Sequence, residues 1–201
     1  MSLSITTHWG LLEDMSFSVK SVKKVMLGAV EDNGRYILDR CKWTPSKCTL
    51  FVWRSEMDRI PTSDALGKRG VAVGDGLCTF CKSEVKMVEH IFTSCGFSTV
   101  LWQKISQWCR IPPIFAFTFR DLLEIHKAGH IRTEVRRVVQ GIIIVSCWCL
   151  WMAWNKAIFS SKEAKMDDVF SEVKSLGFLW FKHRSRINHI SWLDWCNFVL
   201  M

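Results

Sequence analysis

The sequence predicts a mainly α protein, in which a small helical module is followed by two long C-terminal helices. Apolar residues recur at helical spacing along most of the chain, whereas few segments alternate with the period of two that marks a strand. Of the 201 residues, 49% are hydrophobic, which is enough to bury a sizeable core. Four prolines and eleven glycines are too few for a low-complexity chain.

The first seventy residues predict three helices. In FSVKSVKKVML, residues 17–27, three valines and a methionine fall on one helical face and three lysines lie opposite; a polar loop follows. Pro45 suits the first position of a second helix. Ile60-Pro61 ends it, because the residue before a proline avoids helical geometry. Thr62 or Ser63 then caps a short helix that ends at Gly70.

Three more helices are predicted downstream. Residues 97–109, FSTVLWQKISQWC, are amphipathic, and IPPIFAF at 111–117 breaks the pattern. Two long helices follow at 133–160 and 167–189. The first contains an uncharged stretch, Gly141–Trp154. A membrane span needs about 20 apolar residues, so this shorter stretch favours a buried core helix over membrane insertion.

A cluster of cysteines and one histidine predicts a metal site. Cys78, Cys81, His90 and Cys95 have the spacing C-x2-C-x8-H-x4-C. Three thiolates and an imidazole suit a tetrahedral Zn²⁺, and four protein ligands leave no open position, so the zinc would be structural. A thioredoxin-like redox pair and a chance cluster are the alternatives. The redox pair lacks the βαβ context that it needs.

The composition bears on location and partners. The start MSLSITTHWG has neither the basic nor the apolar region of a secretory signal, so we expect an intracellular, non-secreted protein whose nine cysteines are reduced or bind metal. Whether that location is nuclear or cytoplasmic stays open. The net charge of +8 is spread along the chain and is compatible with RNA or DNA as a partner.

Several motifs around the cluster resemble the reverse-transcriptase zinc-binding domain of plant non-LTR (LINE-type) retrotransposons. They are WTPSK at 43–47, FVWR at 51–54, RIPT at 59–62, LGKRG at 66–70, the four metal ligands, HIF at 90–92 and Trp102. FSVKS upstream and CWCLWMAWNKAIF downstream also resemble segments that flank this domain. Trp154 stands where the resemblance implies an arginine.

The resemblance implies a C-terminal fragment that accompanies a polymerase, supplied in cis or in trans. It implies assistance in RNA or DNA binding without catalysis, and no small-molecule substrate. We accordingly divide the chain into a flanking helix and loop at 1–40, the zinc-binding domain at 41–110 and a helical C-terminal region at 111–201. The alternative is a decayed copy that serves as a zinc-stapled protein-interaction module without nucleic-acid binding.

We find no catalytic motif in the sequence. Asp167-Asp168, in KMDDVF, faintly resembles the acidic pair of polymerases, but no hairpin pattern surrounds it. Two acids in the first turn of a helix are the better interpretation. There is also no Gly-x-Ser-x-Gly elbow and no phosphate-binding glycine loop.

Basic residues near the zinc module and near the C-terminus are the candidate nucleic-acid contacts. The first group is Arg54, Arg59, Lys68, Arg69, Lys82 and Lys86, and the second is Lys182, Arg184 and Arg186. Such residues also occur on any solvated face. Eleven tryptophans could stack on bases, but Trp53, Trp102, Trp148 and Trp151 fall on apolar helical stripes, which favours core packing.

Overall fold

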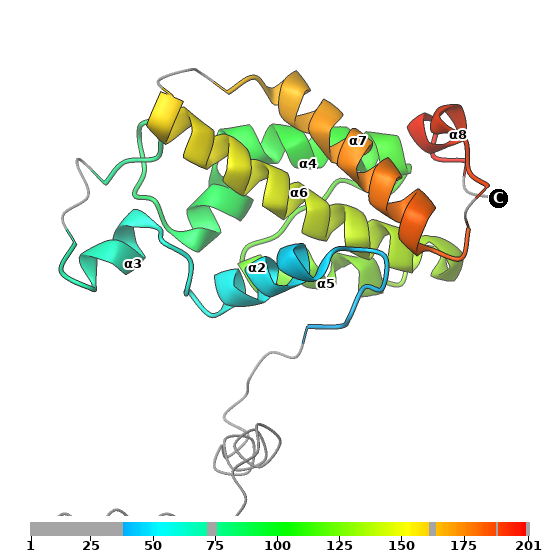
Figure 1. Ribbon diagram of the computed structural model, residues 1–201. Coiled ribbons are helices and arrows are strands. Elements are labelled where there is room, and N and C mark those ends of the chain that lie inside the picture. Colours follow the sequence, from blue (N-terminus) through cyan, green and yellow to red (C-terminus); the bar gives the residue numbers. More distant parts are fainter. Residues whose placement is uncertain (1–37, 72–75, 161–163, 188, 200–201) are drawn as a thin grey trace, which may run out of the picture. The chain divides into compact units, whose positions relative to one another are not determined.

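The computed structural model describes residues 38–71, 76–160, 164–187 and 189–199, which belong to one compact unit (Figure 1). The helix predicted within residues 17–27 lies outside the described residues. The described part is mainly helical, as predicted, and it contains no strand. Its one β-bridge is isolated and joins Leu77 to Val85 in antiparallel fashion.

Helices α2 (Ser46–Glu56) and α3 (Ser63–Gly67) form the N-terminal part of the unit. Pro45 lies one residue earlier than predicted, at the N-cap of α2. The helix ends at Glu56, before the Ile60-Pro61 stop, because Asp58 adopts a left-handed conformation with φ +50°. The hydroxyl of Thr62 accepts a hydrogen bond from the Ala65 backbone N–H, so the predicted cap of α3 is confirmed.

The middle of the chain contains a π-helix, η1 (His90–Ser94), then α4 (Gly96–Cys109), α5 (Phe119–Glu124) and a 3-10 helix, η2 (Ile125–Lys127). Helix α4 confirms the amphipathic prediction. Helix α5 was not predicted from the sequence. It begins with a capping box: the Thr118 hydroxyl accepts a hydrogen bond from the Asp121 backbone N–H, and the Asp121 carboxylate accepts one from the Thr118 backbone N–H.

Helix α6 (Thr133–Ser160) lies at the centre of the unit, in contact with α2, α5, α7 and both short helices, η1 and η2 (Figure 1). Every residue from 138 to 147 is buried. The described residues include one helix that is long and apolar enough to cross a membrane, Thr133–Phe159, but 56% of its most apolar window is buried by the protein. A helix that is apolar all round is expected for a central core position.

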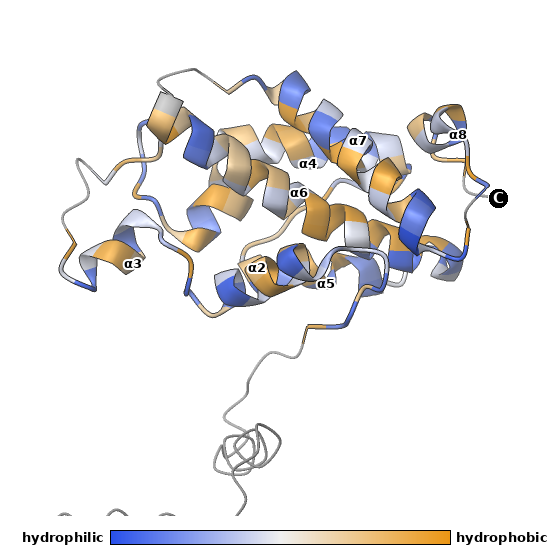
Figure 2. Cartoon of the chain, in the orientation of Figure 1, coloured by the Kyte–Doolittle hydropathy of each residue, from blue (hydrophilic) through white to orange (hydrophobic). Residues whose placement is uncertain are grey.

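Helix α7 (Met166–Arg184) packs on α6 and α4, and the short α8 (Trp192–Cys196) packs on α7. Helix α7 ends at Arg184 and not at the predicted His189, because Ser185 is extended. Helix α8 was not predicted; Ser191 and Asp194 form its capping box. Figure 2 shows that orange apolar residues alternate with blue hydrophilic ones along α2 and α7, whereas α6 is mostly orange or pale.

Two glycines admit tryptophan rings against helix backbones. A Cβ on Gly141 of α6 would overlap the Trp43 indole, whose Nε1 donates to the Arg137 carbonyl at 3.0 Å. A Cβ on Gly177 of α7 would lie 2.9 Å from the Trp195 ring. The two indoles meet edge to face, with ring centroids 6.4 Å apart. This contact joins the beginning and the end of the described chain.

Core packing was predicted for four tryptophans, and two of them confirm it. Trp102 and Trp151 are buried. Trp148 is only half-buried, and the prediction for Trp53 is wrong, since its side chain is 36% exposed. The apolar stripe of α2 faces α6 through Cys48, Phe51 and Val52, and Trp53 lies beside that stripe.

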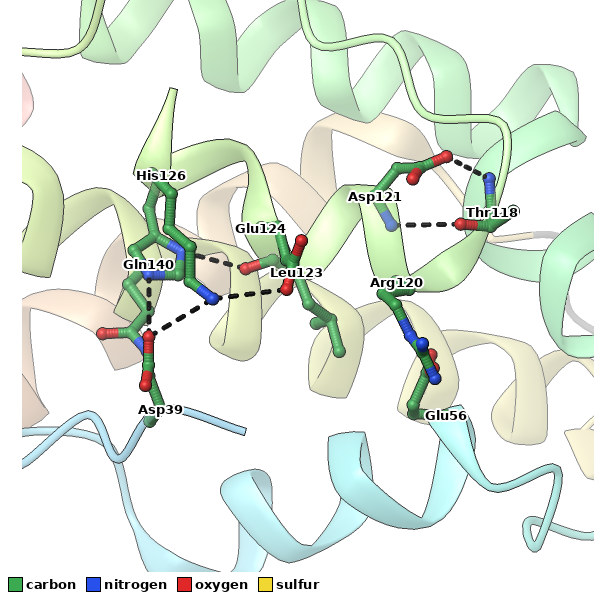
Figure 3. A network of polar contacts seen from close by, with 10 residues as sticks. Asp39, Glu56, Thr118, Arg120, Asp121, Leu123, Glu124, His126 and Gln140 are labelled. Atoms are coloured by element: carbon green, nitrogen blue, oxygen red, sulfur yellow. Dashed lines mark hydrogen bonds and ion pairs between the residues drawn. The ribbon is translucent and has the colours of Figure 1, made fainter. Parts of the chain in front are cut away.

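A polar network fixes the segment before α2 to the middle of the fold (Figure 3). The buried imidazole of His126 lies 3.9 Å from an Asp39 carboxylate oxygen, and Lys127 lies 3.5 Å from the same atom. The Gln140 amide donates to the Asp39 carbonyl at 2.6 Å. Nearby, Arg120 of α5 pairs with Glu56 of α2 at 2.7 Å.

Candidate metal centre

The first two cysteines of the cluster lie on a tight knuckle between Leu77 and Val85. The Cys78 N–H donates to the Glu84 carbonyl at 2.7 Å, and the Lys82 N–H donates to the Cys78 carbonyl at 2.7 Å. Lys82 closes the turn with φ +57°, a left-handed conformation that glycine adopts more readily. Because the turn is this tight, the Cys78 and Cys81 sulfurs face the same point.

The other two residues of the cluster come from a helical segment, as the sequence predicted. His90 begins the π-helix η1, and Cys95 is the N-cap of α4. The Cys95 N–H donates to the His90 carbonyl at 2.8 Å, which is the i→i+5 bond of a π-turn. The wider turn lets the imidazole and the Cys95 sulfur point to one side. Such π-turns recur at functional sites.

The four side chains meet at distances that suit zinc. The Cys78 and Cys95 sulfurs lie 3.9 Å apart, and the Cys81 sulfur lies 3.2 Å from Nε2 of His90. All four ligand atoms fall within 4.8 Å of one another. Tetrahedral zinc places two sulfurs about 3.8 Å apart and a sulfur and a nitrogen about 3.5 Å apart. The donor set and its geometry therefore fit a structural Zn²⁺, with Nε2 as the histidine ligand.

Hydrogen bonds favour the thiolate forms of Cys78 and Cys81. The contact with the Cys95 thiol lowers the pKa of Cys78 to about 4, aided by the backbone N–H groups of Phe80 and Cys81, and the same contact raises the pKa of Cys95. Burial opposes ionisation of Cys81, but hydrogen bonds from Ser83 outweigh it and lower its pKa. A bound zinc would take the place of the proton that Cys78 and Cys95 share, because thiolates are its ligands.

Neighbouring groups position and cover the centre. The Ser94 hydroxyl lies 3.4 Å from Nδ1 of His90, where it can accept the proton that directs Nε2 to the metal. The rings of Phe80 and Phe97 stack with centroids 4.1 Å apart. They come from the knuckle and the first turn of α4, so this pair joins the two halves of the site. Cys78, His90 and Cys95 are buried.

The remaining described cysteines do not form a second metal site. Within the described ranges, the cluster at 78–95 is the one group of three or more cysteine, histidine or acidic side chains arranged for a metal. Cys109, Cys147 and Cys149 are buried, and burial raises the pKa of each thiol. Burial likewise raises the pKa of Cys48 to about 11. These thiols are parts of the apolar core.

The basic residues predicted as nucleic-acid contacts in the zinc module differ in exposure and in ion pairing. Lys82 and Arg69 are exposed, and Arg54 is exposed and donates to the Arg59 carbonyl at 3.2 Å. Lys68 pairs with Asp58 at 3.4 Å and Asp64 at 2.6 Å, which offsets its charge. Lys86 is buried to 9% exposure, with its ammonium 5.6 Å from the Trp154 ring centroid. Lys86 is therefore the least accessible of the predicted contacts.

The C-terminal candidates lie at the end of α7. Arg184 and Arg186 are exposed, and the Lys182 ammonium lies 5.3 Å from the Phe178 ring centroid. Arg184 also acts electrostatically on Cys48 of α2, so the end of α7 comes close to the start of α2. Sequence reasoning did not single out Lys47 as a contact. Its ammonium lies 5.3 Å from the Trp148 ring centroid and 5.7 Å from that of Trp180.

The acidic pair occupies the first turn of α7, and that interpretation is confirmed. Asp167 forms an ion pair with Lys104 of α4 at 2.9 Å. Asp168 lines a cavity of about 580 Å³ between the end of α6 and the start of α7, together with Lys156 and Glu172. Both carboxylates are exposed.

The fold and the centre together define a mainly helical protein that contains a structural zinc-binding domain. Residues 17–102 match the family described as zinc-binding in reverse transcriptase, so this domain is of the reverse-transcriptase type, as the motifs predicted. The match includes all four ligands and ends at Trp102 in α4. A search of curated proteins and a search of solved structures each found no match.

Proposed function

We propose that this chain is a non-catalytic accessory part of a reverse transcriptase, which helps a polymerase in cis or in trans to hold RNA or DNA. The observation that carries the proposal is the match of residues 17–102 to the reverse-transcriptase zinc-binding family, together with the four assembled ligands. The motifs at 43–102 and the downstream segment CWCLWMAWNKAIF resemble those of plant LINE-type elements, which favours such an element as its origin. The net charge of +8 suits a polyanionic partner.

The zinc supports this role through structure. Four protein ligands complete a tetrahedron and leave no position for a water or a substrate. The metal would hold the knuckle against α4, and so fix the orientation of the exposed basic residues on α2, α3 and the knuckle. An intracellular location, where thiols stay reduced, is the condition under which such a site persists.

Salt-dependent binding tests the proposal. Zinc-loaded protein is titrated into labelled RNA, single-stranded DNA and duplex DNA at several salt concentrations. If phosphate contacts carry the binding, the logarithm of affinity falls linearly with the logarithm of salt, by roughly 0.7–0.9 for each phosphate neutralised. The Cys81→Ser variant, without its metal, should bind more weakly. Absence of salt-sensitive binding to all three would refute the proposal.

A zinc-stapled protein-interaction module is the second candidate, and one observation favours it. Phe115 and Phe117, in the loop between α4 and α5, are 78% and 93% exposed. Large exposed apolar side chains often mark a protein contact. This candidate predicts that Phe117→Ser leaves the metal and the fold unchanged and that the wild-type chain has no affinity for RNA or DNA.

A further inference from the structure

Two exposed cations, Lys47 and Arg184, and two half-buried rings, Trp148 and Trp180, form a group that we call the Lys–Trp surface. We propose that this surface binds single-stranded nucleic acid, with bases stacked on Trp180 and Trp148 and phosphates held by Lys47 and Arg184. The inference rests on the proposed function and specifies where a strand would bind. It differs from the basic residues of the zinc knuckle, because three of its four residues lie outside residues 17–102 and the fourth, Lys47, lies on α2.

Three helices contribute to the Lys–Trp surface. Lys47 lies in the first turn of α2, Trp148 in the middle of α6, and Trp180 and Arg184 in the last two turns of α7. The lysine joins them, since its ammonium lies 5.3 Å from the Trp148 ring and 5.7 Å from the Trp180 ring. Trp180 and Arg184 are four residues apart on α7, so their side chains share a face of that helix.

The charge of the Lys–Trp surface suits an anion. Lys47 and Arg184 are both positive, and both charges lower the pKa of the Cys48 thiol, against the larger effect of burial. Within the described residues, neither of them forms an ion pair with a carboxylate, in contrast to Lys68 and Lys127. Both side chains are exposed. Two unpaired cations beside aromatic rings match the alternation of phosphate and base along a strand.

The rings are accessible enough to stack on a base. Trp148 and Trp180 are half-buried, whereas Trp43, Trp102 and Trp195 are buried. Trp148 is held from beneath by Phe51, with ring centroids 5.5 Å apart at an interplanar angle of 82°. A half-buried ring whose position the core fixes can stack on a base without a large loss of conformational entropy, once the Lys47 ammonium moves from the ring to a phosphate.

The same surface continues along α2. Leu50 and Arg54 follow Lys47 at helical spacing on the same face, and both are exposed, Leu50 to 55%. Arg54 is one of the contacts predicted from the sequence. A strand that stacks on Trp180 and Trp148 could therefore extend toward Arg54. The candidate contacts on α2 and on α7 would then bind the same strand.

Substitutions with matched controls test the Lys–Trp surface. Zinc-loaded protein is titrated into labelled oligothymidylate and oligouridylate of about 16 nucleotides, the upper end of the usual site size, and into a duplex of the same length. The variants are Trp180→Ala, Trp180→Phe, Lys47→Ala and Arg184→Ala. Lys165→Ala removes the same charge at the opposite end of α7, and Trp192→Ala removes an exposed tryptophan from α8. Metal content and unfolding temperature identify any variant that fails to fold.

The expected result is a loss of about tenfold in single-strand affinity for Trp180→Ala, from one lost stacking contact, with a smaller loss for Trp180→Phe. Lys47→Ala and Arg184→Ala should each reduce the slope of log affinity against log salt by the amount expected for one phosphate contact. Both control variants should bind as tightly as the wild type does. Comparison of the affinities for oligothymidylate and oligouridylate shows whether the surface prefers DNA or RNA.

Three results would overturn the inference, and they separate it from the proposed function. If the wild type binds but Trp180→Ala binds no worse than Trp192→Ala, the strand contacts another surface and only this inference fails. If Trp180→Ala abolishes a concentration-dependent dimer and leaves oligonucleotide binding unchanged, the surface joins two copies of the chain. If the wild type binds no nucleic acid, the proposed function fails as well.

Discussion

Trp43 lies directly against Gly141, and its indole N–H reaches the Arg137 carbonyl one helical turn earlier, at 3.0 Å. A ring can approach a helix backbone this closely only where no Cβ intervenes. Gly141 is therefore a packing requirement of α6, although glycine is a poor helix former. The same arrangement recurs at Gly177, where Trp195 donates to the Lys174 carbonyl at 2.9 Å.

Gly141→Ala should destabilise the fold. Alanine in a helix interior is favoured over glycine by about 0.5–1 kcal/mol, but the added methyl would displace the Trp43 ring from the core. Overpacking of this kind costs roughly 1–3 kcal/mol, and loss of the indole hydrogen bond adds about 1 kcal/mol. We expect a net loss of about 2 kcal/mol in the free energy of unfolding, measured by denaturant titration. Gly129→Ala is the control, since nothing lies within 4 Å of its Cβ; equal stability of the two variants would contradict the packing.

Removal of the metal should unfold the domain in part. Cys81→Ser removes one of four ligands, and the free energy of metal binding is also folding free energy in small zinc sites. We expect one zinc per chain in the wild type, little in the variant, and an unfolding midpoint lower by about 10 °C or more. Cys196→Ser, at a half-buried cysteine outside the cluster, should keep both the metal and the midpoint. Wild-type protein that unfolds identically with and without a chelator would rule out a structural zinc.

Ser94→Ala should weaken zinc binding while the fold persists. The hydroxyl lies 3.4 Å from Nδ1 of His90, and loss of such a partner typically lowers metal affinity about tenfold or more. Competition with a chromophoric chelator gives the affinity directly. Ser171→Ala, at an exposed position of α7, is the matched control. An unchanged affinity for Ser94→Ala would show that the backbone alone orients the imidazole.

Lys82→Gly should stabilise the zinc-loaded protein. Lys82 has φ +57°, and a residue with a Cβ in the left-handed region costs roughly 1–2 kcal/mol relative to glycine. We expect a gain of about 1 kcal/mol in the free energy of unfolding. Lys82→Ala separates the charge from the backbone effect, because it removes the ammonium and keeps the Cβ. If both variants gain equally, relief of charge repulsion explains the result.

Acidification should destabilise the network of Figure 3. Burial holds the pKa of His126 below its usual range, with the Lys127 and Arg137 charges acting in the same direction and the Leu123 carbonyl and Asp39 opposing them. The unfolded chain binds a proton near pH 6.5 while folded His126 stays neutral, so stability is full above about pH 6.5 and falls as pH drops toward the folded pKa. His126→Gln should show a weaker fall between pH 7 and 5, by denaturant titration of both proteins in parallel. An identical pH profile in the two would assign the acid sensitivity to other groups, including the metal ligands.

The zinc site could be predicted from the sequence because its four ligands are close along the chain, and their residue types and spacing are typical of a zinc site. Helices α4 and α7 were predicted because their apolar residues recur at helical spacing, which is also a local pattern. Helices α5 and α8 are too short to show an apolar period, but the capping boxes Thr118–Asp121 and Ser191–Asp194 are local sequence patterns that indicate where each begins.

Other features depend on contacts that no local pattern contains. The end of α2 depends on Asp58 entering the left-handed region, and the exposure of Trp53 depends on which side of α2 meets α6. Lys47 was part of a family motif, but its position between Trp148 and Trp180 arises from three helices that are distant in sequence. The division of the chain at residues 40 and 110 stays a prediction.

The contact of Trp43 with residues far downstream has a consequence for the order of synthesis. A ribosome adds about 5–20 residues per second, so the zinc ligands, 17 positions apart from first to last, emerge within about 1–3 s of one another. Trp43 must wait about 5–20 s for Arg137, 94 positions later, and longer for Trp195. The nascent chain can therefore capture its metal well before the tryptophan is covered. A chaperone would then meet a metal-loaded knuckle in a chain whose Trp43 is still uncovered, and translation that stops before α6 would leave that side chain exposed.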